Sequence, residues 1–458
     1  MNQQIIILIM MLFAASPLFP GDLKSISQSA DSIVKTALRD STGYKLLESL
    51  CQIGPRLSGS EQSVKAALFS LDAMKKQGYD TAWLQPITVP KWVRGTKERA
   101  ILKSGKGKKL KPLSVASLGG SIGTNGSISA GVIEINSFNE MKSKAGDIKD
   151  KIVFYNVKWD QGLVNTFNGY GRLAGYRVFG GIEAAKYGAK GFIVRSITTR
   201  NDNTPHTGVT YYNDTLPKIP GLAIGIIDAD FLSNYIKKDP SAKVTLEMNC
   251  YSAGDVPSYN VIGEIKGKEF PYEILTVSGH LDSWDKGDGA HDDGAGCMQS
   301  LEIPYLLKKT GYQNKRTVRC VLFMNEENGY RGADGYANLI ANDGKEHLLA
   351  IESDRGAYTP RGFTVEKDTA LVGILREFLP VLRKAGIDWV ETGGSGADIA
   401  RLKTIKNLIG FVPDDQRYFD VHHSANDVFS EVNHRELELG SASMAILIML
   451  IDKNDLIK

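Results

Sequence analysis

The stretch EILTVSGHLDSWDKGDGAHDDGAGCMQSLEIPYLLKK, residues 273–309, contains a complete strand–loop–helix unit. Its first residues, EILTVSG, form a short apolar run typical of a buried strand, and its last residues have the apolar spacing of a helix. The loop between them holds two histidines and five aspartates within residues 278–296, laced with glycine. Such a loop is either a solvated acidic turn or part of a metal site.

The same alternation continues along the rest of the C-terminal half. Apolar strand-like runs (residues 316–325, 348–354 and 406–413) alternate with helical stretches (residues 369–386 and 434–453). This pattern predicts an α/β fold with a mixed central sheet flanked by helices. In such sheets the functional loops gather beyond the carboxyl ends of the strands.

Composition narrows the class of protein. The 458 residues are too many for one ordinary core, so we expect two domains or one domain with a large insertion. The net charge of +3 comes from 55 basic and 52 acidic residues without long blocks, which gives no electrostatic case for a nucleic-acid partner. The four cysteines form no CxxC pair, so the sequence does not favour thiolate zinc sites and leaves disulfide pairing open.

The N-terminal residues have the pattern of a secretory signal peptide. An apolar run over residues 5–15 is followed by small residues and prolines, and it is too short for the ~20 residues that span a bilayer. No Lys or Arg precedes the run, which is atypical of a signal. We expect a signal peptide over residues 1–21, export to the periplasm or the extracellular space, and no membrane span.

Four strand ends carry residues of the kind that bind metals. They are His280, Asp282 and Asp292 in the opening loop, Glu326 and Glu327 after the next strand, Asp354 after the third, and His422 and His423 with Asp427 near the C-terminus. Imidazole and carboxylate groups form the usual ligand set of zinc. Because all four strand ends should meet at one edge of the sheet, they predict a metal site there.

These motifs, HLD…DDGAG, NEE, SD and HHSAND, resemble those of the dizinc peptidases of family M28. GHLDSWDKGDGAHDDGAG and GGSGADI (residues 393–399) are closest to the branch of carboxypeptidase Q, also called plasma glutamate carboxypeptidase. The resemblance implies a zinc-exopeptidase fold with a small β-rich insert similar to a protease-associated (PA) domain. It divides the chain into residues 22–115 (N-terminal part of the peptidase domain), 116–250 (PA-like insert) and 251–458 (catalytic domain).

Carried over residue by residue, the resemblance also implies the roles of the site. His280 and Asp354 would hold one zinc ion, Glu327 and His423 the other, and Asp292 would bridge the two. Asp282 would accept the imidazole N–H of His280 and fix its tautomer. Glu326 would be the general base that takes a proton from the attacking water and passes it to the leaving amine.

The polar neighbours are expected to have supporting roles. Asp293 should cap the following helix, His291 should lie at the cleft rim, Asp285 and Asp288 should be solvated, and Asp427 should orient the His423 loop. Many relatives have Tyr before the last metal histidine, where this chain has His422. The donor to the oxyanion is therefore His422 or Tyr418, or the role is absent. Ser395 and Asp398 either line the substrate cleft or belong to a glycine-rich turn.

The leading function is an exported exopeptidase acting on short unblocked peptides as an aminopeptidase or dipeptidase, and a homodimer is a further expectation. A carboxypeptidase of the same mechanism would need Arg or Lys for the terminal carboxylate, and Arg331 and Arg355 are the candidates. A glutaminyl cyclase-like transferase would work with one zinc ion. A non-catalytic receptor-like module should have lost metal ligands, and this chain retains them all.

Overall fold

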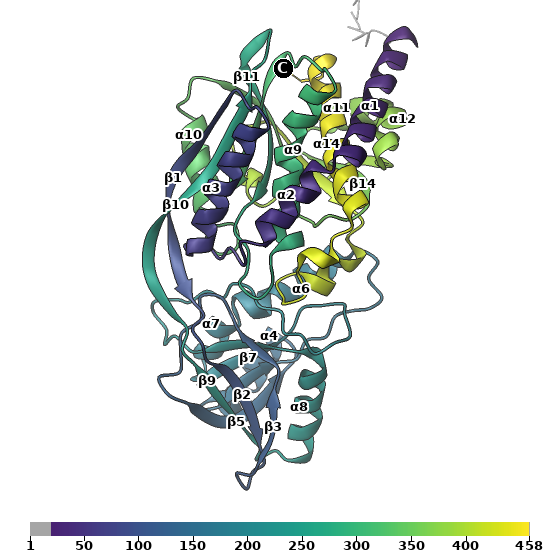
Figure 1. The fold of residues 1–458 in the computed structure, drawn as a ribbon. Helices are drawn as coiled ribbons and strands as arrows, with labels where there is room; N and C mark the ends of the chain where they lie inside the picture. Colours follow the sequence, from purple (N-terminus) through teal and green to yellow (C-terminus); the bar gives the residue numbers. More distant parts are fainter. Residues whose placement is uncertain (1–19, 458) are drawn as a thin grey trace, which may run out of the picture.

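The computed structural model describes residues 20–457 and shows two lobes, one above the other (Figure 1). The predicted signal peptide lies almost entirely outside the described residues. Among the described residues, no helix is long and apolar enough to cross a membrane.

The upper lobe is built on an eight-stranded sheet with the order β1-β10-β12-β11-β13-β16-β14-β15. Strands β11, β12, β13 and β16 run parallel to their neighbours in this group. The pairs β1–β10, β10–β12 and β14–β16 are antiparallel, and the edge strand β15 is parallel to β14. The expected mixed α/β sheet is therefore confirmed. The strands are β1 (Thr81–Val93), β10 (Tyr251–Ile265), β11 (Phe270–His280), β12 (Arg316–Phe323), β13 (Glu346–Glu352), β14 (Pro360–Glu366), β15 (Trp389–Thr392) and β16 (Asn407–Pro413).

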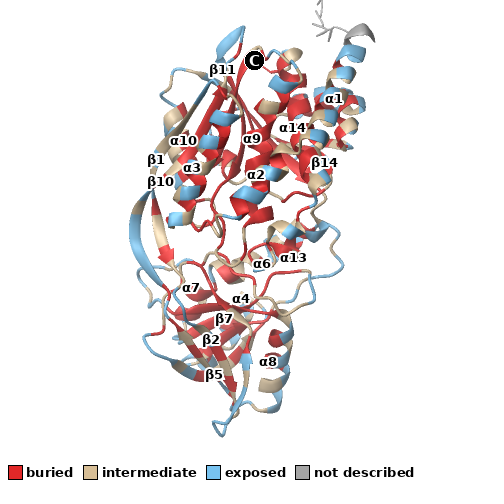
Figure 2. Cartoon of the chain, viewed as in Figure 1, coloured by how far each residue is buried: buried red, intermediate tan, exposed pale blue. Residues whose placement is uncertain are grey.

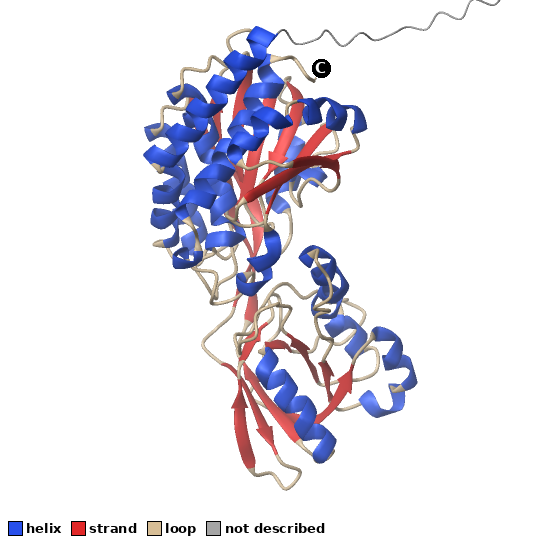
Figure 3. Ribbon diagram, turned by 90° about the vertical axis from the view of Figure 1, so that its right-hand side faces the viewer, coloured by secondary structure: helices blue, strands red, loops and turns tan. Residues whose placement is uncertain are grey.

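Helices cover both faces of this sheet. The helices of the lobe are α1 (Pro20–Asp40), α2 (Thr42–Cys51), α3 (Glu61–Lys76), α9 (Ala295–Lys309), α10 (Arg331–Ile340), α11 (Thr369–Glu377), α12 (Leu379–Leu382), α13 (Tyr418–Val421) and α14 (His434–Lys453). Most pack on one face (Figure 3). Alternate side chains of β12 point to opposite faces of the sheet. Cys320 packs in the core on the side of α9 and α14, and Phe323 packs in the core on the side of α10.

The lower lobe is a second, inserted domain. Its eight-stranded sheet has the order β3-β2-β9-β5-β6-β7-β8-β4. The strands β6, β7 and β8 are buried throughout, and the edge strand β3 is largely exposed (Figure 2). The strands are β2 (Glu98–Lys103), β3 (Lys109–Leu113), β4 (Val115–Ser117), β5 (Ile128–Ile135), β6 (Ile152–Tyr155), β7 (Gly191–Arg195), β8 (Gly221–Ile224) and β9 (Lys243–Met248). The helices are α4 (Phe138–Ser143), α5 (Ala145–Ile148), α6 (Thr166–Val178), α7 (Gly180–Ala185) and α8 (Ile226–Lys238).

The insertion begins earlier than the sequence indicates. Strands β2 and β3, which we expected in the N-terminal part of the peptidase domain, pair within the second sheet. The Gly- and Ser-rich run that starts at residue 115 is therefore strand β4 and the turn after it, both inside the inserted domain, and not the domain boundary. The link between the lobes is the ribbon of β1 and β10, which pair along their length from Thr81 and Glu264 to Val93 and Tyr251 (Figure 1).

The four cysteines are buried and free. The apolar C-terminal segment forms the buried part of α14, as its pattern predicts.

Candidate metal centre

The polar residues singled out in the sequence meet at one edge of the upper sheet. His280 is the last residue of β11, Glu326 and Glu327 follow β12, and Asp354 follows β13. These three strands are parallel neighbours, so their carboxyl ends lie side by side. His423 reaches the same place from the loop after α13.

Three ligand groups converge at a first position. Nε2 of His280 lies 3.2 Å from Oδ1 of Asp292 and 3.3 Å from Oδ1 of Asp354. Zinc–ligand bonds of about 2.0 Å in tetrahedral geometry place neighbouring ligand atoms about 3.3 Å apart. The His280–Asp292–Asp354 group therefore has the spacing of a zinc site.

A second position uses the other oxygen of the same aspartate. Nε2 of His423 lies 3.3 Å from Oδ2 of Asp292 and 3.0 Å from Oε2 of Glu327. Oδ2 of Asp292 and Oε1 of Glu327 are buried and have no hydrogen-bond partner among the described residues. Since buried polar atoms are normally paired, these oxygens fit a bound cation. Asp292 thus offers one oxygen to each position.

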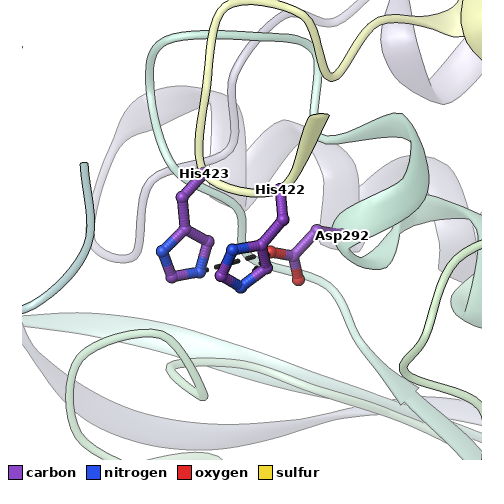
Figure 4. A group of neighbouring side chains, drawn as sticks. All are labelled: Asp292, His422 and His423. Carbon is purple, nitrogen blue, oxygen red and sulfur yellow. Dashed lines mark ion pairs between the residues drawn. The ribbon is translucent and has the colours of Figure 1, made fainter. Parts of the chain in front are cut away.

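His422 also lies at the second position (Figure 4). Its Nε2 is 3.6 Å from Oδ2 of Asp292, and its ring stacks on that of His423 with centroids 3.6 Å apart. Burial, together with the charge of His423, holds the pKa of His422 well below its usual value. Burial alone would also lower the pKa of His423, but the Glu327 charge raises it to about 9. Glu327 is closer to His423 and carries the charge that a divalent ion favours, so it is the better third ligand.

The tautomer of His280 is fixed differently from our expectation. Its Nδ1 lies 3.0 Å from the backbone carbonyl oxygen of Asp282, whereas the carboxylate of Asp282 is 4.0 Å away. The carboxylate oxygen Oδ1 instead accepts the backbone N–H groups of Asn325, at 2.6 Å, and Glu326, at 3.1 Å. The side chain of Asp282 therefore holds the turn that carries Glu326.

Asp427 contacts two loops. Its backbone N–H donates to the carbonyl oxygen of Ser424, next to His423, at 3.3 Å. Its carboxylate accepts the backbone N–H groups of His291, at 2.7 Å, and Asp292, at 3.1 Å, so it also holds the loop of Asp292. His291 is fully buried, stacked on Tyr358 with centroids 4.5 Å apart, so its expected place at the cleft rim is wrong.

Three other aspartates of the opening loop have structural contacts. Asp293 accepts the backbone N–H of Gly296 in the first turn of α9, as expected of a cap, and it also accepts that of His280. Asp285 is not solvated, because it forms an ion pair with Arg94 at 2.5 Å. Asp288 is half-buried and accepts the backbone N–H of Phe429 at 3.4 Å.

The ligand groups line a cavity of about 440 Å³, and two of the four predicted substrate contacts line it with them, Tyr418 and His422. The other two do not line it. Ser395 donates a hydrogen bond to Glu366 at 2.7 Å, and Asp398 is fully buried. Burial, with the charges of Glu352 and Glu326, raises the pKa of Asp398 well above its usual value.

The inserted domain supplies cavity residues that the sequence did not reveal. Phe167, Tyr170 and Arg177 come from α6, and Val209 and Tyr211 from the loop after β7. Neither Arg331 nor Arg355 lines the cavity; Arg355 lies over the ring of Phe167, 4.4 Å from its centroid. No motif marks these inserted-domain residues, because only the docking of the two lobes brings α6 to the metal centre.

Residues 260–437 match the model of peptidase family M28. Carboxypeptidase Q of Mus musculus is 32% identical over 405 residues, which cover 88% of this chain and 84% of that protein. The chain belongs to peptidase family M28. Carboxypeptidase Q of Xenopus laevis is 34% identical over 415 residues, covering 89% of this chain and 86% of that protein.

Solved structures of peptidases share the fold. A peptidase M28 precursor from Shewanella amazonensis is 32% identical, with a TM-score of 0.88 over 94% of this chain and 97% of that one. A zinc aminopeptidase from Bacillus subtilis is 19% identical, with a TM-score of 0.63 over 91% of this chain and 94% of that one. The expected M28 metallopeptidase is thereby confirmed, and its donor set fits zinc.

Proposed function

We propose that this M28 peptidase is an exported dizinc exopeptidase that hydrolyses short unblocked peptides as an aminopeptidase or dipeptidase. The observation that carries the proposal is the shared aspartate: the two oxygens of Asp292 face two separate groups of ligands. His280 and Asp354 would hold one zinc ion, and Glu327 and His423 the other.

Zinc ions bound there would supply a water of lowered pKa and would polarise the scissile carbonyl. Glu326 is the general base in this proposal. It lines the cavity beside the ligand groups, and Asp282 fixes its backbone. Burial raises the pKa of Glu326 well above its usual value, and the positive charge of bound zinc ions would lower it again. A carboxylate under these two opposing effects can take a proton from water and return it to the leaving amine.

The carboxylates that line the cavity are those of Asp292, Glu326, Glu327 and Asp354, and this proposal assigns all four to the zinc ions or to the base. Recognition of the amino end therefore rests on the expectation from the sequence and is decided by the blocked peptides below. Arg177 is the one arginine or lysine among the described residues that line it, and it favours the second candidate, a carboxypeptidase that would bind the terminal carboxylate there. Relatives bear both kinds of name, carboxypeptidase and aminopeptidase.

Two other functions are less consistent with the site. A glutaminyl cyclase-like transferase needs one zinc ion, whereas two groups of ligands are present. A receptor-like module needs no base, and Glu326 is in place. Export through residues 1–21, the PA-like nature of the insert and a homodimer remain part of the proposal.

The test is hydrolysis of one dipeptide in three forms, unblocked, N-acetylated and C-amidated, with and without a chelator. We expect cleavage of the unblocked and amidated forms, loss of cleavage on acetylation, and loss in chelator that zinc restores. Loss on amidation but not on acetylation would favour the carboxypeptidase. Hydrolysis that ignores the chelator would contradict the metallopeptidase mechanism.

A further inference from the structure

Tyr170 and Arg177 project from one face of α6 toward the metal centre. Residues seven apart on a helix lie two turns apart on the same face. Both side chains line the cavity that also holds His280, Asp292 and Glu326. In Figure 1 α6 lies at the junction of the two lobes, directly below the C-terminal loops of the upper lobe. The inserted domain therefore forms one wall of the site.

Arg177 holds the hydroxyl group of Tyr170. Its Nη2 donates to the phenolic oxygen at 2.7 Å, and its Nη1 donates to the carbonyl oxygen of Thr207 at 3.3 Å. A guanidinium group can only donate hydrogen bonds, so the phenolic oxygen is the acceptor and keeps its own hydrogen to donate. Over residues 20–457, the hydroxyl takes part in this one hydrogen bond, in which it is the acceptor. The hydrogen is therefore free for a ligand in the cavity.

The ring of Tyr170 is fixed against the residues that surround the metal centre. It stacks on Phe419 with centroids 5.0 Å apart and meets the ring of His422 edge-on at 5.1 Å. Burial raises the pKa of Tyr170 and Arg177 lowers it, while the charges of Glu327 and Asp292 act to raise it. The hydroxyl thus lies in the field of an arginine on one side and of two proposed metal ligands on the other.

We propose that Tyr170 is a catalytic residue supplied by the inserted domain: its hydroxyl donates a hydrogen bond to the scissile carbonyl oxygen as that oxygen becomes negative. Tyr170 keeps its proton throughout, and Arg177 is the positioning residue that aims the hydroxyl. A preorganised donor of this kind is stronger when its oxygen already accepts a charged hydrogen bond. The proposal rests on the peptidase function and deepens it.

The two donors considered from the sequence are less well placed for this role. The ring of His422 stacks on His423, and its Nε2 faces Oδ2 of Asp292. Tyr418 stacks flat on Phe167 at 5.7 Å, and among the described residues no cation bonds to its hydroxyl. Tyr170 alone of the three has a charged partner that fixes the direction of its donor.

The test compares Tyr170→Phe with Tyr176→Phe. Tyr176 is on the same helix but packs in the core of the inserted domain, 4.5 Å from Phe138 between ring centroids. The readouts are kcat and KM for an unblocked dipeptide, zinc content, and affinity for a phosphinic analogue of the tetrahedral intermediate and for the free amino acid product. Y170F should lose about 10²–10³-fold in kcat and a large part of the analogue affinity, as removal of an oxyanion donor does. KM, zinc content and product affinity should match those of Y176F.

Arg177 provides a second variant pair. Its Nη1 also lies 3.3 Å from Nδ1 of His423, so zinc content is measured for these variants as well. R177M should lower kcat and analogue affinity in the same direction as Y170F, and R177K should restore part of both. In the double variant Y170F/R177M the losses should not add, because both changes remove one interaction. Thermal melts of all variants separate misfolding from loss of the donor, and the arginine pair carries the test if Y170F does not fold.

Two results would overturn the proposal. One is Y170F with kcat and analogue affinity equal to those of Y176F. The other is Y170F with raised KM and weakened product binding but unchanged kcat, which would mean that Tyr170 binds the ground state. A wild-type protein without chelator-sensitive hydrolysis would refute both the peptidase function and the role of Tyr170. An active wild type with an equally active Y170F would refute the role of Tyr170 alone.

Discussion

Thr207 and His423 contact each other through two hydrogen-bonding groups across the junction of the two lobes. The backbone N–H of Thr207 donates to the carbonyl oxygen of His423 at 2.8 Å, and Nδ1 of His423 lies 3.3 Å from the carbonyl oxygen of Thr207. The neighbouring Nδ1 of His206 lies 2.7 Å from the carbonyl oxygen of His422. A loop of the inserted domain therefore fixes both the backbone of His423 and the tautomer that leaves its Nε2 free for a metal.

Disturbing this loop should weaken the metal centre. Gly208 has φ +130°, and a Cβ there would lie 2.4 Å from Cζ of Arg177. Gly208→Ala should therefore displace the loop and reduce zinc affinity by about 10–100-fold, the usual effect of losing an outer partner of a ligand. Gly126→Ala is the control, because Gly126 has φ +104° in the same domain and no atom within 4 Å of a new Cβ. Equal zinc affinity of the two variants in competition titrations would refute this role.

Asp427 should affect the position of Asp292, the proposed bridging ligand. Asp427→Asn loses one of the two carboxylate oxygens that accept the N–H groups of His291 and Asp292. Zinc titration should show binding weakened by about 10–100-fold. Asp414→Asn removes an ion pair with the exposed Arg361 and keeps an oxygen that can accept the backbone N–H of Gln416, so this variant should bind zinc like the wild type. A D427N protein with wild-type zinc affinity would show that the loop does not need this carboxylate.

Substitution of Asp282 distinguishes its two possible roles, which are to hold the backbone of Glu326 and to orient His280. Because its carboxylate holds the backbone of Glu326, Asp282→Ala should lower kcat by about 10²-fold or more while zinc binding persists. Asp282→Asn keeps Oδ1 as an acceptor and should retain more activity. The measurement is kcat together with zinc content. Loss of zinc before loss of kcat would instead support the role predicted from the sequence, in which Asp282 orients His280.

A buried pair of carboxyl groups should make stability depend on pH. Glu302 of α9 and Glu438 of α14 are fully buried next to each other. Among the described residues, neither carboxyl oxygen of Glu302 has a hydrogen-bond partner when both groups are ionised. A proton shared between the two carboxyl groups would supply the missing hydrogen bond. Burial, with the charge of Glu302, raises the pKa of Glu438 from its usual 4.5 to about 10. The contribution of Glu438 to the free energy of unfolding is complete below pH 4.5 and is lost as the pH rises toward 10. Between these pH values the carboxyl group of Glu438 gives up its proton in the unfolded chain but keeps it in the folded protein.

Glu438→Gln tests this effect. The amide can still accept the backbone N–H of Tyr44 and can donate to Glu302, but it cannot ionise. Urea unfolding between pH 6 and pH 9 should show a smaller fall in stability for E438Q than for the wild type, by up to about 1.4 kcal/mol per pH unit. Glu377→Gln, at an exposed position, should follow the wild type. Parallel pH profiles for all three proteins would contradict the buried pair as the cause.

The fold and the polar cluster were predictable because each depends on local pattern. The runs that became β11, β12 and β13 are apolar and end in His280, Glu326 and Asp354 or just before them, and parallel strands bring their carboxyl ends together. The sequence alone therefore places these residues at one edge. Their metal-binding roles remain predictions.

What the sequence could not predict depends on docking and on backbone groups. Tyr170 reaches the cavity, and Thr207 reaches His423, only because the ribbon of β1 and β10 carries the inserted domain back against the upper lobe. Asp282 was misread because the backbone carbonyl, which no residue type reveals, takes the place of its carboxylate beside His280. The boundary at residue 115 was misplaced because a glycine-rich turn within a sheet resembles a linker.

The measurement that tests the central claim most directly is hydrolysis of an unblocked dipeptide by Glu326→Gln beside the wild type, with zinc content determined in the same samples. A dizinc peptidase with Glu326 as its base predicts two zinc ions per chain in both proteins and a kcat lower by about 10²–10⁴-fold in E326Q. An E326Q protein that binds the same zinc and hydrolyses at the wild-type rate would contradict it.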